Sequence, residues 1–91
     1  MKIRWTSEAT DCLEHIGQHI AGDNPEAALK TVNTIFEHIE ELTVFPNRGR
    51  LGREEGTREM VFSPLPYIAV YRVRESTIEI LHIWHGAQNR Q

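Results

Sequence analysis

Three strand candidates in the second half of the chain are joined by very short connectors. They span Arg58–Ser63, Tyr67–Val73 and Thr77–Trp84, and three residues separate each from the next. All three are rich in β-branched, aromatic or alternating apolar residues, as strands are. A parallel pair needs a crossover of a dozen or more residues, so strands joined this tightly pair antiparallel. The fold must therefore contain a small antiparallel sheet.

The first half of the chain is dominated by helical periodicity. Residues 2–5 alternate between charged and apolar side chains, which predicts a short opening strand. Two amphipathic helices follow: Thr6 or Ser7 caps the first, and the second begins at Asn24-Pro25 and is predicted to end near Val44. The order is thus β-α-α-β-β-β. We expect an α+β fold, with the helical hairpin packed on one face of the sheet.

A chain of 91 residues is long enough for one hydrophobic core and too short for two. We therefore expect a single domain that spans residues 1–91. The apolar positions of the expected helices and strands predict the core. Its members are Trp5, Leu13, Ile16, Val32, Phe36, Ile39, Ile68, Val70, Ile80 and Ile83.

Several classes of protein and site are not indicated. No apolar run approaches the length of a membrane-spanning helix, and residues 1–6 lack the apolar run of a signal peptide, so we expect a cytoplasmic protein without membrane contact. Cys12 has no partner for an internal disulfide and is predicted to be a core thiol. His15 and His19 have helical metal-ligand spacing but no third ligand, and no glycine-rich loop opens a helix. We expect neither a metal nor another cofactor.

Charge is distributed unevenly along the chain. Residues 1–47 carry three basic and eight acidic groups, whereas residues 48–91 carry seven arginines and five glutamates. Arginine suits planar, bidentate recognition of phosphate or carboxylate, so an anionic partner is plausible for the second half; arginines scattered over a solvated surface are the alternative. Several of these groups lie in the glycine-rich loop from Phe45 to Thr57, on the strands or near the carboxyl end. Arginine and histidine together can bind a phosphodiester and move a proton, or they can hold a polar protein surface.

Four segments of the chain resemble one family of proteins. Taken as a set, they closely resemble the RelE/ParE superfamily of toxins from bacterial type II toxin–antitoxin modules, and the opening strand and the Asn24-Pro25 helix start also fit. The segments are 46–50 (PNRGR), 56–61 (GTREMV), 66–73 (PYIAVYRV) and 78–87 (IEILHIWHGA). The resemblance implies a small toxin that a cognate antitoxin neutralises in a hetero-oligomer.

The resemblance leaves the target open between two branches. RelE-like members cleave messenger RNA on the ribosome without a metal, and ParE-like members inhibit DNA gyrase. RelE-like nucleases carry two basic residues on the strand that matches Arg58–Val61 and an arginine just before the valine-tyrosine motif; this chain has Met60 and Ile68 at two of these places. The segment around Trp84-His85 looks more like the ParE branch. We therefore expect a plasmid-stabilisation toxin that inhibits gyrase.

Two alternatives remain at this stage: a RelE-like messenger RNA endonuclease, and an inactive homologue that only binds an antitoxin. If the chain is a nuclease, its predicted catalytic residues are Arg58, Arg72 and His85. The residues predicted to bind the target, whether gyrase or the ribosome with its message, are Arg48, Arg50, Arg53, Gln88 and Arg90.

Overall fold

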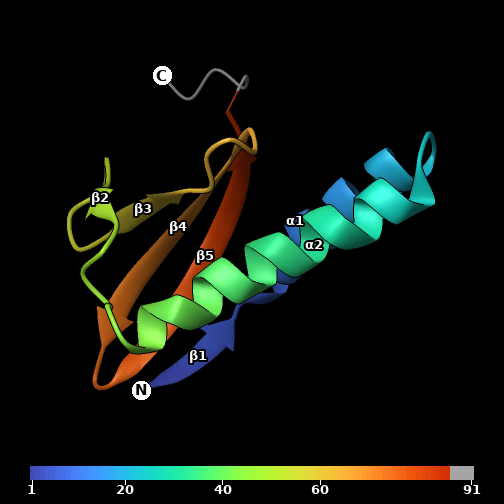
Figure 1. Ribbon diagram of the computed structural model, residues 1–91. Coiled ribbons are helices and arrows are strands. Elements are labelled where there is room, and N and C mark those ends of the chain that lie inside the picture. The colour runs from blue at the N-terminus through green and yellow to red at the C-terminus, as the bar shows by residue number, and fades with distance from the viewer. Residues whose placement is uncertain (87–91) are drawn as a thin grey trace.

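The computed structural model describes residues 1–86, which form two helices, a single 3₁₀ turn and five strands (Figure 1). In chain order these are β1 (Lys2–Trp5), α1 (Ser7–Ala21), α2 (Pro25–Glu40), the 3₁₀ turn η1 (Glu41–Thr43), β2 (Arg50–Leu51), β3 (Arg58–Val61), β4 (Tyr67–Arg74) and β5 (Thr77–His85). The predicted α+β class and β-α-α-β-β-β order are confirmed.

The strands form one sheet in the order β1-β5-β4-β3-β2. β3, β4 and β5 pair antiparallel, as the short connectors predict. β2, which was not predicted, also pairs antiparallel with β3. β1 runs parallel to β5, so the sheet is mixed rather than purely antiparallel. β2 is a two-residue strand within the glycine-rich loop, too short to give a periodic signal.

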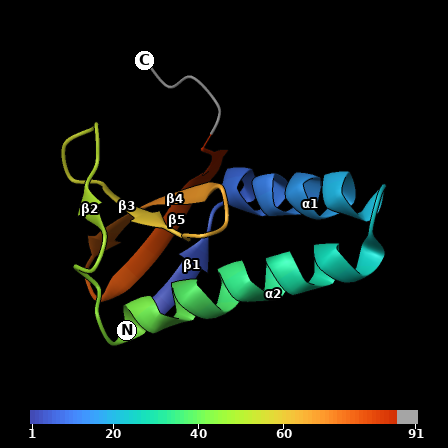
Figure 2. The same cartoon turned by 45° about the horizontal axis from the view of Figure 1, so that its top comes forward.

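Both helices start at the predicted caps. The Thr6 hydroxyl accepts a hydrogen bond from the Ala9 amide at 3.1 Å, and the Asn24 side chain accepts one from the Ala27 amide at 3.0 Å. α2 ends at Glu40 rather than near Val44, and η1 continues it as a tighter turn. The helices lie side by side and antiparallel, and the loop that joins them is far from the sheet (Figures 1 and 2).

The core lies between the helical hairpin and one face of the sheet. Its largest fully buried side chains are Tyr71, Phe62, Ile35, Ile39, Leu42, Ile78 and Ile80. The sheet face away from the helices is called the open face below. On β5, Glu79 belongs to the open face because both of its neighbours, Ile78 and Ile80, are buried in the core.

The predicted core was wrong at Phe36, whose side chain is 45% exposed. Ile35 and Ile39, four residues apart, occupy the stripe that faces the sheet, and Phe36 is rotated about 100° from Ile35 on the helix. Its ring instead stacks on Trp5, with ring centroids 6.1 Å apart and planes 9° from parallel. Val32 and Val70 are only partly buried, whereas Ile39, Ile80 and Ile83 are core residues as predicted. Ile68 is buried as predicted, but on the open face.

Candidate functional site

Residues 46–57 of the glycine-rich loop, called the arginine loop below, are anchored to the sheet by a buried tyrosine. Tyr71 of β4 is fully buried; its hydroxyl donates to the Pro46 carbonyl at 2.8 Å and accepts a hydrogen bond from the Gly49 amide at 2.8 Å. Burial raises the pKa of Tyr71 above its ordinary value, although the Gly49 hydrogen bond and the charge of Arg58 act the other way. One side chain therefore satisfies two loop backbone groups from within the core.

Gly49 is the point where the loop backbone comes closest to the sheet. A Cβ atom at this position would lie 2.8 Å from the Glu59 carbonyl oxygen and 2.8 Å from the Tyr71 ring. Contacts this short leave no room for any side chain. The close approach therefore depends on a glycine. It also fixes the backbone position from which the side chains of Arg48 and Arg50 extend.

Arg58, a predicted catalytic residue, holds the backbone of this loop. Its Nη1 atom donates to the Gly49 carbonyl at 2.7 Å and to the Asn47 carbonyl at 3.2 Å. Its guanidinium is thus partly used by the loop itself.

The predicted target-binding arginines of the loop differ in their partners. Arg50 pairs with Glu59 at 3.0 Å, and Arg48 pairs with Glu41 of η1. Arg53 is exposed and has no ion pair within residues 1–86. The loop therefore presents Arg48, Arg50 and Arg53 at the surface, and two of them are already neutralised by carboxylates. Gln88 and Arg90, also predicted to bind the target, lie outside the described residues.

The three predicted catalytic residues do not converge. The strand register pairs Arg58 with Tyr71 and His85 with Tyr67, and both tyrosines belong to the core side of the sheet. These two pairs are four residues apart along β4, or about 13 Å. Arg72 pairs with Glu79 and so lies on the open face. The His85 ring instead contacts Tyr67 edge to face, with centroids 5.3 Å apart.

The open face of β3 carries no positive charge. Met60 is buried in the core, so the open-face positions of this strand are Glu59 and Val61. Ile68, which pairs with Val61, and Trp84, which pairs with Ile68, continue an apolar row across β4 and β5. No arginine or lysine stands in this row to bind a phosphate.

A second group of cations, which the sequence did not suggest, lies at another corner of the open face. Arg4 and Arg72 flank Glu79 across β5: Arg4 Nη1 and Arg72 Nε each lie 2.6 Å from one of its carboxylate oxygens. In the next row, Thr77 pairs with Lys2 on one side and with Arg74 on the other. We call this group the basic corner; it consists of Lys2, Arg4, Arg72 and Arg74.

Glu79 is the acidic centre of the basic corner. The hydrogen bond from Arg72 is the main cause that lowers the pKa of Glu79 below its ordinary value, and the charges of Arg72, Arg4 and Arg74 act in the same direction against burial. The carboxylate therefore stays ionised at neutral pH and holds both guanidinium groups in place.

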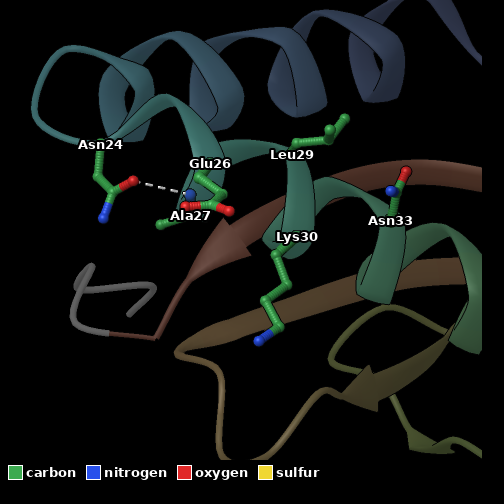
Figure 3. A pocket seen from close by; sticks show the side chains of 6 residues that line it. All are labelled: Asn24, Glu26, Ala27, Leu29, Lys30 and Asn33. Carbon is green, nitrogen blue, oxygen red and sulfur yellow. Dashed lines mark hydrogen bonds between the residues drawn. The ribbon is translucent and has the colours of Figure 1, made fainter.

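A hollow at the start of α2 shows no comparable arrangement (Figure 3). All of its lining residues come from one end of one helix, and the Asn24 side chain is used as the cap of that helix (Figure 3). Its lining residues are Asn24, Glu26, Ala27, Leu29, Lys30 and Asn33. We assign no chemistry to it.

Cys12 lies beside His82 of β5. Its Sγ atom is 3.6 Å from Nδ1 and 3.7 Å from Nε2 of the imidazole, and Nδ1 also contacts the Glu8 carboxylate. A sulfur equally far from both nitrogens lies over the ring rather than in line with either N–H group. The contact therefore packs α1 against β5 and does not resemble a thiolate paired with an in-line proton acceptor.

Two further features bear on function. Within residues 1–86, no helix is long and apolar enough to cross a membrane. The same residues contain no group of three or more histidine, cysteine or acidic side chains placed to hold a metal ion.

Comparison with known proteins agrees with this fold. Residues 3–90 match the family described as ParE toxin of type II toxin-antitoxin system, parDE. The chain is 40% identical over 87 residues to "Putative toxin Y4kP" of Sinorhizobium fredii, covering 96% of this chain and 90% of that protein. It is 29% identical over 68 residues to Toxin RelE1 of Caulobacter vibrioides, covering 74% of this chain and 73% of the relative.

A solved structure described as the chromosomal ParDE TA system from P. aeruginosa is similar over most of both chains. It superposes with a TM-score of 0.84 at 32% sequence identity, covering 93% of this chain and 95% of the other. The family match spans nearly the whole chain, and the relatives agree in both sequence and fold. The chain therefore belongs to the ParE toxin family of type II toxin–antitoxin systems.

Proposed function

We propose that this toxin inhibits DNA gyrase, acts in the cytoplasm and is neutralised by a cognate antitoxin that binds it in a hetero-oligomer. Its membership of the ParE family supports the gyrase target, and the likeness to a ParDE structure supports the antitoxin partner. The proposal includes a role for Arg48, Arg50 and Arg53 of the arginine loop, with Gln88 and Arg90, in contacting the target.

One observation favours gyrase over messenger RNA. Metal-free cleavage of RNA needs a general base, a general acid and cations placed together around one phosphate. Arg58 and Arg72 lie on opposite faces of the sheet, and β3 presents Glu59 and Val61 on its open face. A negative charge and an apolar side chain would not stabilise the developing charge of a phosphoryl transition state.

The outer edge of β3 is a suitable site for the antitoxin. β2 pairs only with Arg58 and Glu59, so the end of β3 around Val61 has no strand on its outer side within residues 1–86. A hollow along this edge is lined by β2, β3 and His38 of α2, and Val61 is 47% exposed. An extended antitoxin segment could add a strand here and place an apolar side chain against Val61.

A side-by-side assay tests the target. Purified toxin should block supercoiling by gyrase and leave messenger RNA intact in a reconstituted translation extract. The similarity to Toxin RelE1 makes cleavage of messenger RNA the alternative outcome of this assay. Cleaved message with normal supercoiling would replace the proposal with a RelE-like nuclease and would require Arg58, Arg72 and His85 to act in a conformation different from this one.

The antitoxin proposal has its own test. Co-expression with the protein encoded by the adjacent gene should allow the two to be purified as one complex, and Val61→Lys should weaken that complex while the toxin remains folded. A toxin that is recovered alone would count against the partner. If Val61→Lys leaves both the activity of the toxin and its binding to the antitoxin unchanged, the antitoxin binds at another site.

A further inference from the structure

We propose that the basic corner binds the phosphodiester backbone of a nucleic acid. This goes beyond the proposed function, because it concerns a surface separate from the arginine loop and requires neither gyrase nor an antitoxin. It rests on how Lys2, Arg4, Arg72 and Arg74 are placed on the open face.

The sheet arranges the four cations as a small grid. Arg4 and Arg72 flank Glu79 in one row, and Lys2 and Arg74 flank Thr77 in the next. Neighbouring strands are about 4.8 Å apart and alternate residues of a strand about 6.7 Å, so the backbone positions span roughly 10 by 7 Å. The amino terminus lies beside the β4–β5 turn in both views, which brings β1 to this corner (Figures 1 and 2).

These side chains are accessible. Arg4 has 65% of its side chain exposed and Arg72 has 38%, and Lys2 and Arg74 are exposed as well. Lys2 and Arg74 have no ion pair within residues 1–86. Two of the four cations are therefore unneutralised, and the other two are partly open to solvent.

The local charge is opposite in sign to that of the whole molecule. Four cations surround one carboxylate, Glu79, with a second acidic group, Glu75, in the adjoining turn, although the chain as a whole carries a net charge of −3. A cationic surface on an acidic protein orients a polyanion toward that surface. The basic corner would thus decide which face of the toxin meets a nucleic acid.

Glu79 positions two of the cations without using up their donors. Each guanidinium has five N–H donors, and the carboxylate engages Nη1 of Arg4 and Nε of Arg72. Within residues 1–86 neither guanidinium makes a further hydrogen bond. The remaining N–H groups can point toward a phosphate while Glu79 holds the arginines in place, so Glu79 is a positioning residue.

The chemistry fits a phosphodiester better than an acidic protein. Exposed ion pairs between proteins contribute about 0–1 kcal/mol each, and tight protein interfaces depend on buried aromatic or apolar anchors. Between the cations on the open face stand Thr77 and Glu79, which are not such anchors. A nucleic acid needs no anchor, since neutralising its phosphates releases condensed counterions.

Fluorescence anisotropy of the full-length chain with labelled DNA and RNA duplexes of matched sequence tests this directly. With four phosphate contacts on DNA, log K should fall with log salt at a slope of about −3.6, and in Lys2→Gln/Arg74→Gln at about −1.8. We expect that double variant to bind at least tenfold more weakly at low salt.

Lys30→Gln is the matched control for Lys2→Gln, since both remove one exposed lysine, and Lys30 belongs to the first part of α2, whose start lies far from the sheet (Figures 1 and 2). Circular dichroism and thermal melting show whether each variant is folded. The DNA and RNA arms identify the source of the phosphodiester. Three results would each overturn the proposal: no binding to either duplex, an equal loss in Lys2→Gln and Lys30→Gln, or stronger competition by polyglutamate than by unlabelled duplex.

Discussion

The arginine loop and the basic corner both gather cations, but the protein builds them in opposite ways. The loop is one stretch of sequence whose shape depends on long-range anchors: the Tyr71 hydroxyl, the Gly49 approach and the Arg58 guanidinium. The corner joins residues from the two ends of the chain, and regular strand register places them. A cluster of cations that is visible in the sequence can therefore be used largely to hold the structure together. A cluster that only the fold brings together can present more unpaired charge.

The largest effect is expected where the loop touches the sheet. Gly49→Ala would place a Cβ 2.8 Å from the Glu59 carbonyl, and relief of this clash by backbone movement should cost about 1–3 kcal/mol. Urea denaturation measures the loss. Gly22→Ala is the control, because the nearest atom to its added Cβ is 3.4 Å away and its φ is helical at −57°. Equal stability of both variants would show that the loop is not held at Gly49.

The hydroxyl that anchors the loop should matter nearly as much. Tyr71→Phe leaves the Gly49 amide without its acceptor in a buried place, which should cost about 1–3 kcal/mol. Tyr67→Phe is the control, because the Tyr67 hydroxyl makes no hydrogen bond within residues 1–86 and should be removed at little cost. Hydrogen exchange at Gly49 should speed up only in Tyr71→Phe. Unchanged exchange there would contradict the anchoring role.

The basic corner offers a change in the other direction. Glu75 and Ser76 form the β4–β5 turn with φ of 48° and 63°, a left-handed conformation that favours asparagine and glycine. Replacing them together, Glu75→Asn and Ser76→Gly, should stabilise the fold by about 1 kcal/mol. Thermal melting measures the gain. A lower melting temperature would mean that the Glu75 and Ser76 side chains make compensating contacts.

The smallest effect expected is a pH dependence centred on Glu79. The pKa of this carboxyl is lowered in the folded state, so its contribution to stability is complete above the ordinary pKa of a glutamate and is lost as the pH falls through the folded value. The stability difference between the wild type and Glu79→Gln should therefore be constant near neutral pH and shrink in acid. Denaturation at several pH values checks this. A difference that persists at the lowest pH would assign the effect to packing rather than charge.

Much of the fold could be predicted because its determinants are local. Thr6 and Asn24 cap helices through bonds to residues only three positions away, and the short connectors force antiparallel pairing. The parallel β1–β5 pair could not be predicted, because it joins segments about 75 residues apart. The error at Phe36 has a similar origin. Ile35 and Phe36 both fit an amphipathic helix, and only the position of the sheet decides which of them is buried.

The candidate site was less predictable than the fold. The sequence identified the arginine loop because its three arginines lie within six residues of one another, and the family resemblance drew attention to Arg58, Arg72 and His85. Neither showed that Arg58 and Arg72 lie on opposite faces, because that follows from the register of β4 with its two neighbours. In the sequence, Lys2 and Arg4 are only the charged positions of an alternating strand. Their placement near Arg72 and Arg74 follows from the pairing of β1 and β4 with β5. The catalytic and target-binding roles stay predictions until they are assayed.

The parallel pairing of β1 with β5 also sets the order in which the molecule can become complete. The first strand has no partner until residues 77–80 are available, so nearly the whole chain must leave the ribosome before the sheet can close. Contacts at such long sequence separation slow folding, because the intervening chain must be ordered before they form. A nascent toxin therefore cannot assemble the corner that holds Lys2 beside Thr77 until residues 77–80 have left the ribosome.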